Sequence, residues 1–120
     1  MRRLTERSVI DHFYDFIEQR GVAIPAELKS KDPKAANVPN EQVQDGLVHL
    51  YKTQPETTIL LELMTDVDEG LQEWRYRHVK AVERTIGHKL GTGGSAGVEW
   101  LKKSLFQPLF PDLWAIRHRL

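Results

Sequence analysis

Apolar residues recur every three or four positions along most of the chain, which is the spacing of amphipathic helices. The pattern predicts one helix over residues 8–20, closed by Gly21, and a second from Asn40, as N-cap, to about Lys52. The proline-containing stretch between them predicts a loop with a short turn near residues 26–28. No segment alternates with a two-residue period, so we expect no sheet.

The longest apolar pattern begins at Pro55, a residue suited to the first turn of a helix, and continues to about Gly87. It predicts one amphipathic helix, roughly 45–50 Å long at 1.5 Å per residue. Gly70 interrupts the pattern at a cost of about 1 kcal/mol relative to alanine, without ending the helix. The apolar stripe of this predicted helix consists of Leu60, Leu63, Met64, Val67, Leu71, Trp74, His78, Val82 and Thr85.

After Gly87 the composition changes to a glycine-rich loop over residues 91–97. A helix is expected over residues 95–106, ended by Pro108, and a shorter apolar turn follows Pro111. The chain therefore predicts an all-α helical bundle with one long central helix, a glycine-rich loop and short C-terminal helices. We expect a single domain covering residues 1–120.

Charge and composition exclude several classes of function. Seventeen basic and seventeen acidic residues give a formal net charge of zero, which lacks the basic surface of a general nucleic-acid binder. The absence of cysteine excludes thiolate chemistry and cysteine-based zinc sites. The apolar runs are too short to cross a membrane, and the N-terminal residues lack the apolar segment of a signal peptide, so we expect a cytoplasmic protein.

His78 is the most informative candidate for a functional residue, because it lies on the apolar stripe between Trp74 and Val82. A buried imidazole without a partner costs about 1–3 kcal/mol, so a partner is expected. Three interpretations of His78 remain open. It would be a core histidine that is hydrogen-bonded to protein, a residue that acts as an acid or a base, or an axial ligand of haem iron.

Three cations stand near His78: Arg75, Arg77 and Lys80. Cations beside a buried histidine favour an anionic group such as a haem propionate, which arginine binds through two hydrogen bonds. Alternatively, these cations belong to a solvated face and pair with Glu73 and Glu83.

The glycine-rich loop, with the hydroxyls of Thr92 and Ser95, would let backbone N–H groups approach a ligand. It is not a phosphate-binding P-loop, since no Lys-Ser/Thr pair follows the last glycine. The alternative is a flexible connector.

Three motifs occur in a fixed order along the chain: Trp74-Arg75-Tyr76-Arg77-His78, Ile86-Gly87-His88-Lys89 and Gly91-Thr92-Gly93-Gly94-Ser95-Ala96-Gly97. The C-terminal segment adds Phe110-Pro111-Asp112-Leu113-Trp114. Together these motifs resemble the C-terminal part of the tryptophan 2,3-dioxygenase family, in its bacterial form. The resemblance covers nearly the whole chain but only part of the family's longer polypeptide.

The resemblance implies an all-helical, homo-oligomeric protein with haem b, which inserts O₂ into L-tryptophan to give N-formylkynurenine. By match to the motif, His78 is the implied proximal ligand of the iron, and Arg75 lies at the cofactor. Thr92 and Gly93 are the implied substrate-binding residues. Substrate, O₂ and haem are the implied partners, and no nucleic acid or membrane is expected.

The distal histidine and the Arg/Tyr pair of that family come from its earlier part, so no catalytic residue is assigned here. We expect a second chain to complete the pocket, or this chain to be part of a larger enzyme. The alternative is a catalytically inactive domain that binds haem or oligomerises.

Overall fold

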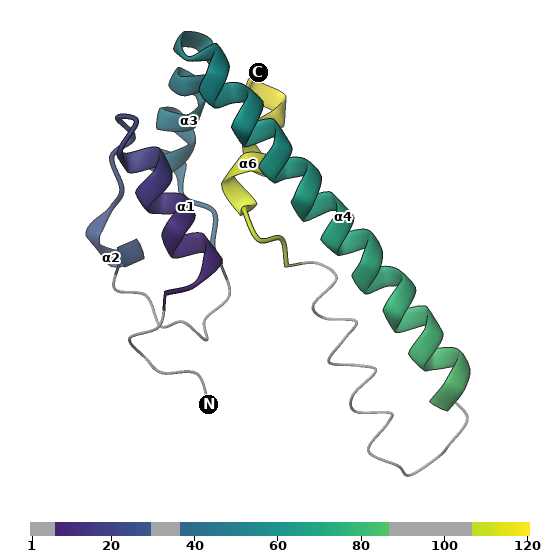
Figure 1. Cartoon of the computed structure of the whole chain (residues 1–120). Coiled ribbons are helices and arrows are strands. Elements are labelled where there is room, and N and C mark those ends of the chain that lie inside the picture. Colours follow the sequence, from purple (N-terminus) through teal and green to yellow (C-terminus); the bar gives the residue numbers. More distant parts are fainter. Residues whose placement is uncertain (1–6, 30–36, 87–106) are drawn as a thin grey trace. The chain divides into compact units, whose positions relative to one another are not determined.

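The structure, a computed structural model, describes residues 7–29, 37–86 and 107–120, and all regular structure in them is helical (Figure 1). The elements are α1 (Val9–Glu18), α2 (Ala26–Lys29), α3 (Glu41–Thr53), α4 (Pro55–Ile86), α6 (Pro111–Ala115) and the 3-10 helix η1 (Ile116–Arg119). The described ranges contain no strand, and α4 is the long helix, so the all-α prediction is confirmed. Among these helices, none has the length and apolar composition needed to cross a membrane.

Local hydrogen bonds explain where the first helices begin and end. Ser8 caps α1 by a capping box, in which the Asp11 N–H donates to Ser8 Oγ (3.4 Å) and the Ser8 N–H donates to Asp11 Oδ2 (2.8 Å). Gly21, beyond the end of α1, has a φ of 103°, which favours glycine. Asn40 Oδ1 accepts from the Val43 N–H (3.1 Å) and caps α3. The predicted boundaries are thus confirmed.

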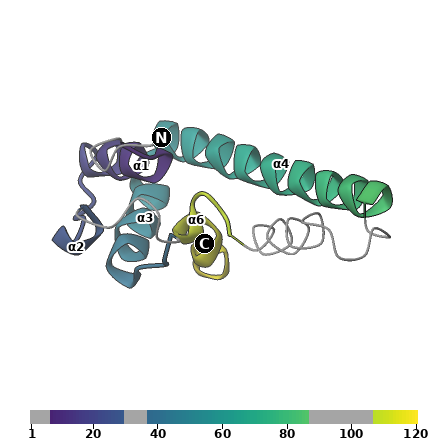
Figure 2. The same cartoon turned by 90° about the horizontal axis from the view of Figure 1, so that it is seen from below.

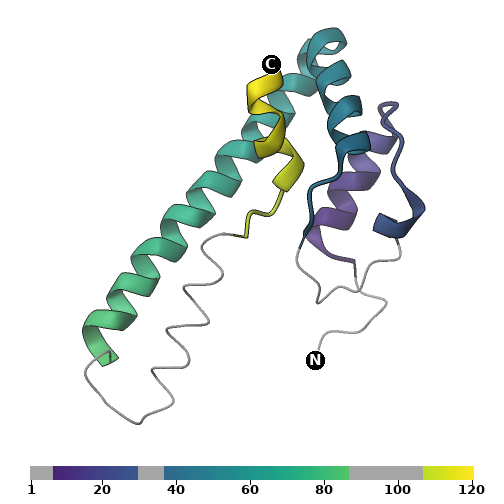
Figure 3. The same cartoon turned by 180° about the vertical axis from the view of Figure 1, so that it is seen from behind.

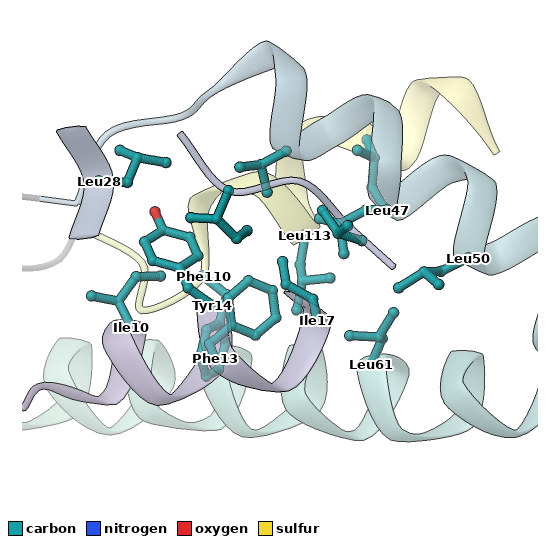
Figure 4. Close-up of a cluster of buried hydrophobic side chains, with 14 of the residues drawn as sticks. Ile10, Phe13, Tyr14, Ile17, Leu28, Leu47, Leu50, Leu61, Phe110 and Leu113 are labelled. Carbon is teal, nitrogen blue, oxygen red and sulfur yellow. The ribbon is translucent and has the colours of Figure 1, made fainter. Parts of the chain in front are cut away.

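The described residues form two compact units. The first contains those up to Thr65 together with Leu109–Leu120, and the second runs from Asp66 to Pro108. The expectation of a single domain stays a prediction. Figure 4 shows the core of the first unit, to which α1, α3, α4 and the C-terminal segment all contribute. Its buried apolar residues are Ile10, Phe13, Tyr14, Ile17, Val22, Ile24, Leu28, Val43, Leu47, Val48, Leu50, Leu61, Phe110, Leu113 and Ile116.

Within the first unit, α6 and η1 pack against α3 (Figures 2 and 3). Asp112 of α6 joins the two: its Oδ1 accepts from the backbone N–H of Asn40 (2.7 Å) and from Gln44 Nε2 (3.0 Å). Burial raises the pKa of Asp112. Burial, with a contribution from Asp112, also raises the pKa of Tyr14 to about 12. The N-terminus of α3 is therefore stabilised by a carboxyl from the far end of the chain.

A second polar connection joins α3, the first part of α4 and η1. The Tyr51 hydroxyl donates to Glu62 Oε1 (2.7 Å), and the Arg117 guanidinium donates to both carboxylate oxygens of Glu62 (2.5 and 3.3 Å). Hydrogen bonds from Arg117 hold the pKa of Glu62 below its ordinary value. Burial and the hydrogen bond to Glu62 raise the pKa of Tyr51. This arrangement fixes the C-terminal helix against the core of the first unit.

Candidate functional site

α4 does not bury the side that its apolar spacing predicts. In the first unit Leu61 is fully buried, whereas Leu60 and Leu63 are exposed. In the second unit Val79 is buried, whereas its neighbour His78 is exposed. The expectation that His78 and the predicted stripe face the core is therefore wrong. The buried side lies about one residue further along, which is a rotation of about 100° around the helix.

Polar residues can occupy the buried side of α4 because their hydroxyls donate to oxygens about one turn earlier, in α4 itself or directly before it. Thr57 and Thr65 are both buried in the first unit. Thr65 Oγ1 donates to the Leu61 carbonyl (2.9 Å), and Thr57 Oγ1 donates to Gln54 Oε1 (2.9 Å). A hydroxyl that donates to a carbonyl one turn earlier costs little to bury. Apolar spacing alone consequently identifies the wrong side.

The side chains of Trp74 and His78 form the centre of the candidate site, which lies in the second unit. The two rings are stacked, with 4.9 Å between their centroids and 7° between their planes. Trp74 is 60% exposed. No residue that the structure describes forms a hydrogen bond with the His78 imidazole, so the indole holds the ring while its nitrogens are open to a ligand. This arrangement argues against a core histidine bonded to protein.

Arg75 differs from His78 in its surroundings. It is half-buried, and its Nη1 donates to the Gln107 carbonyl (2.9 Å), which ties α4 to the segment before Pro108. Three positions along a helix correspond to about 300°, so Arg75 and His78 are about 60° apart. The structure thus gives Arg75 a bond within the second unit, and its expected role at a cofactor stays a prediction.

The other two cations lie on exposed parts of α4. Lys80 Nζ lies 3.7 Å from Glu83 Oε1 and 5.8 Å from the centroid of the Tyr76 ring. The sequence left open that the cations near His78 belong to a solvated face and pair with nearby glutamates. The pairing of Lys80 with Glu83 agrees with that alternative. Arg77 is exposed as well. Further along α4, Ala81, Arg84 and Thr85 line a shallow open depression.

The residues around His78 fit one side of a haem site. Axial ligation requires an imidazole on a rigid element, beside an apolar surface that covers one face of the porphyrin. His78 projects from a helix of 32 residues and is followed by Ala81 on the same exposed side. A Cβ added at Gly70, one turn before Trp74, would meet nothing within 4 Å, so that side of the helix is open to close approach. The described residues hold no group of three His or carboxylate side chains that could bind another metal.

Thr92 and Gly93, the expected substrate-binding residues, lie outside the described residues, as do the remainder of the glycine-rich loop and the helix expected over residues 95–106. The structure therefore stacks His78 on Trp74 of the sequence motif, whereas Arg75 donates to the Gln107 carbonyl.

Neither Glu62 nor Asp112 was predicted from the sequence as a residue that joins helices. Glu62 joins Tyr51 to Arg117, and Asp112 joins α6 to α3. A local signal exists for Asp112, because an acidic residue directly after a proline is typical of the first turn of a helix. No local signal marks Glu62, since its partners are distant in the sequence.

Comparison with known proteins identifies the relatives of this chain. The tryptophan 2,3-dioxygenase family profile matches residues 42–120. The tryptophan 2,3-dioxygenase of Herpetosiphon aurantiacus is 47% identical over 116 residues, which make up 97% of this chain and 44% of that protein. That of an Anaeromyxobacter species is 47% identical over 114 residues, or 94% of this chain and 42% of that protein.

A relative of lower identity matches over the same share of its length. The tryptophan 2,3-dioxygenase of Geobacillus thermodenitrificans is 38% identical over 122 residues, covering 99% of this chain and 44% of that protein. The chain thus spans less than half the length of these relatives. The match nevertheless includes α3, α4 with the Trp74–His78 pair, and the C-terminal helices. The chain belongs to the tryptophan 2,3-dioxygenase family.

Proposed function

We propose that this chain supplies the proximal side of a haem-dependent dioxygenase site that converts L-tryptophan and O₂ to N-formylkynurenine, in the cytoplasmic breakdown of tryptophan by the kynurenine pathway. Membership of the family supports the substrate and the reaction. One structural observation carries the assignment to His78. Its exposed imidazole is stacked on Trp74 and has no hydrogen-bond partner among the described residues.

In this proposal His78 would hold haem b, with one imidazole nitrogen as a ligand of the iron. Trp74 keeps the imidazole plane in place, so that less rotational freedom is lost on ligation. Bound haem supplies the binding and activation of O₂. The chain itself orients the ligand and covers one side of the cofactor with the apolar surface of α4.

Three further residues complete the proposed assignments. Thr92 would hold the amino-acid end of tryptophan through its hydroxyl and backbone, and Gly93 would let the backbone approach the substrate. Arg75 would contact a haem propionate, a role that competes with its bond to Gln107.

The distal side of the pocket must come from elsewhere, because one helix covers only one face of a haem. The chain corresponds to 44% of the Herpetosiphon relative. We propose that a homo-oligomer, a second chain or a further part of the polypeptide completes the pocket. The coverage of less than half of that relative also favours a second candidate function. In it, the chain is a haem-binding or oligomerising domain of this family without dioxygenase activity.

Titration of the haem-free chain with hemin tests the ligand assignment. We expect a Soret band shifted from that of free hemin, and loss of the histidine-ligated spectrum in His78→Ala. His49→Ala, an exposed histidine on α3, is the matched control and should behave as the unmodified chain. Added imidazole should restore the ligated spectrum of His78→Ala. An unchanged spectrum in His78→Ala would overturn the assignment.

Formation of N-formylkynurenine, followed by its near-ultraviolet absorbance, separates the two candidate functions. The haem-loaded chain alone should form little or none. It should become active when the earlier part of a related enzyme is added as a separate polypeptide. Haem binding through His78 without activity in that mixture would support the inactive-domain alternative.

A further inference from the structure

Two short stretches of the first unit lie side by side, although they are far apart in the sequence. Asn37 Nδ2 donates to the Leu109 carbonyl (3.1 Å), and the Asn40 N–H donates to Asp112 Oδ1 (2.7 Å). Both pairs are 72 positions apart, so the two stretches run in the same direction. The later stretch is therefore fixed at two points, directly before α6 and within its first turn.

The later stretch continues a segment that is also held in the second unit. Arg75 Nη1 donates to the Gln107 carbonyl (2.9 Å), and only Pro108 separates Gln107 from Leu109. We call residues 107–112 the strap. Proline at its second and fifth positions restricts the backbone φ angles there to about −65°. The strap thus has little conformational freedom between its attachment in the second unit and its attachments in the first.

α4 forms the other connection between the two units. It continues without interruption from Pro55 to Ile86, whereas the units divide after Thr65. Leu61 is buried in the first unit, and Val79 is buried in the second. Extending an existing helix is much easier than starting a new one, so each part of α4 supports the other.

The second unit is inserted between two parts of the first one. If it unfolded alone, its chain would become a flexible loop whose two ends the first unit must still hold together. Closing such a loop costs conformational entropy, which lowers the stability of the first unit. If the first unit unfolded alone, the strap would lose its bonds to Asn37 and Asn40, and α4 would lose the packing of Leu61. Unfolding of either unit therefore weakens the other.

We propose that the strap and α4 couple the two units, so that a change within one unit alters the stability of both equally. The coupling acts along the covalent chain. Asn37 and Arg75 are the residues whose side chains attach the strap in the first and in the second unit. Ligation of His78, in the second unit, would then also stabilise the core of the first. That consequence rests on the proposed haem function, whereas the coupling itself does not.

Two backgrounds with a single tryptophan report on the two units separately in the haem-free chain. Trp100→Phe with Trp114→Phe leaves Trp74, whose stack on His78 in the second unit is lost on unfolding. Trp74→Phe with Trp100→Phe leaves Trp114, in α6 of the first unit. In each background, the urea midpoint of the fluorescence should coincide with that of the far-ultraviolet circular dichroism, because a coupled chain unfolds in one transition.

Substitutions in the strap's two attachments test whether an effect crosses from one unit to the other. Asn37→Ala removes a donor in the first unit, and Arg75→Gln removes one in the second. Each should lower the Trp74 and the Trp114 midpoints alike, by roughly 0.5 M urea, because each loses one side-chain hydrogen bond.

Matched controls change similar side chains away from the strap. Gln42→Ala, exposed on α3, and Arg77→Gln, exposed on α4, should leave both midpoints unchanged. Circular dichroism without urea checks that every variant keeps its helices. A midpoint shift confined to the tryptophan of the substituted unit would overturn the proposal. So would a fluorescence midpoint that differs from the circular dichroism midpoint in either background, or equal shifts in the controls.

Discussion

The indole of Trp74 and the imidazole of His78 lie almost parallel, 4.9 Å apart at their centroids and 7° apart in plane. The two residues are four positions apart, which places them one above the other on a helix. Offset aromatic stacking of this kind contributes about 0.5–1.5 kcal/mol beyond burial. The contact therefore restricts the His78 ring before any ligand arrives.

Trp74→Ala should weaken hemin binding several-fold while leaving the free energy of unfolding nearly unchanged. The stack restricts the imidazole, whereas the exposed indole adds little to the core. Hemin titration and urea unfolding measure the two effects. Trp74→Phe keeps an aromatic ring and should be intermediate. Equal hemin affinity in Trp74→Ala and the unmodified chain would contradict the proposed role of the stack.

Substitution of alanine for Gly46 and for Gly70, two glycines within helices, should change the stability of the chain in opposite directions. A Cβ at Gly46 of α3 would lie 2.6 Å from Val22 Cγ1, and Val22 is buried with a stiff β-branched side chain. Gly46→Ala should therefore destabilise the chain by about 1–3 kcal/mol. A Cβ at Gly70 meets nothing within 4 Å, so Gly70→Ala should stabilise α4 by about 1 kcal/mol. Thermal and urea unfolding of both variants measure the signs, and a stabilising Gly46→Ala would contradict the close packing of α3 against Val22.

Asp112→Asn should alter how stability depends on pH. Burial raises the pKa of Asp112, so ionisation of this carboxyl disfavours the folded state. The unmodified chain should lose stability as the pH rises from about 3.8, the ordinary value, through the raised pKa. The asparagine variant does not ionise, so its stability relative to the unmodified chain should increase with pH over that window.

Urea unfolding between pH 3 and 7 measures this difference, with Asp66→Asn at an exposed position of α4 as the control. A difference that stays constant with pH would contradict a raised pKa at Asp112. Asp112→Ala should instead destabilise the chain at every pH by about 1–3 kcal/mol, because Asn40 and Gln44 lose their acceptor.

Glu62→Gln should have the opposite pH dependence. Hydrogen bonds from Arg117 lower the pKa of Glu62, so its carboxylate stabilises the fold above the ordinary pKa of 4.5. That contribution is lost as the pH falls through the lowered pKa. Because the ion pair is exposed, we expect up to about 1 kcal/mol at neutral pH. The gap between variant and unmodified chain should close in acid, and a gap that widens in acid would exclude this pairing.

The sequence by itself determined where α1, α3 and α4 begin. The Ser8 capping box, the Asn40 cap and the first-turn position of Pro55 act through residues within one turn, so their effects are local. The predicted boundaries of α1, α3 and α4 follow from them. The motif around His78 similarly identified the family without any structure.

Only the tertiary structure decided which side of α4 is buried. The helix carries one apolar side and one mixed side, and helical spacing favours the apolar one. The chain instead buries Leu61 with hydrogen-bonded threonines in its first unit, and leaves Trp74 and His78 exposed in the second. The contacts of Glu62 with Arg117, and of Asp112 with Asn40, join residues 55 and 72 positions apart. Such contacts depend on how the elements pack, and a pattern that is read along one helix contains no information about its neighbours.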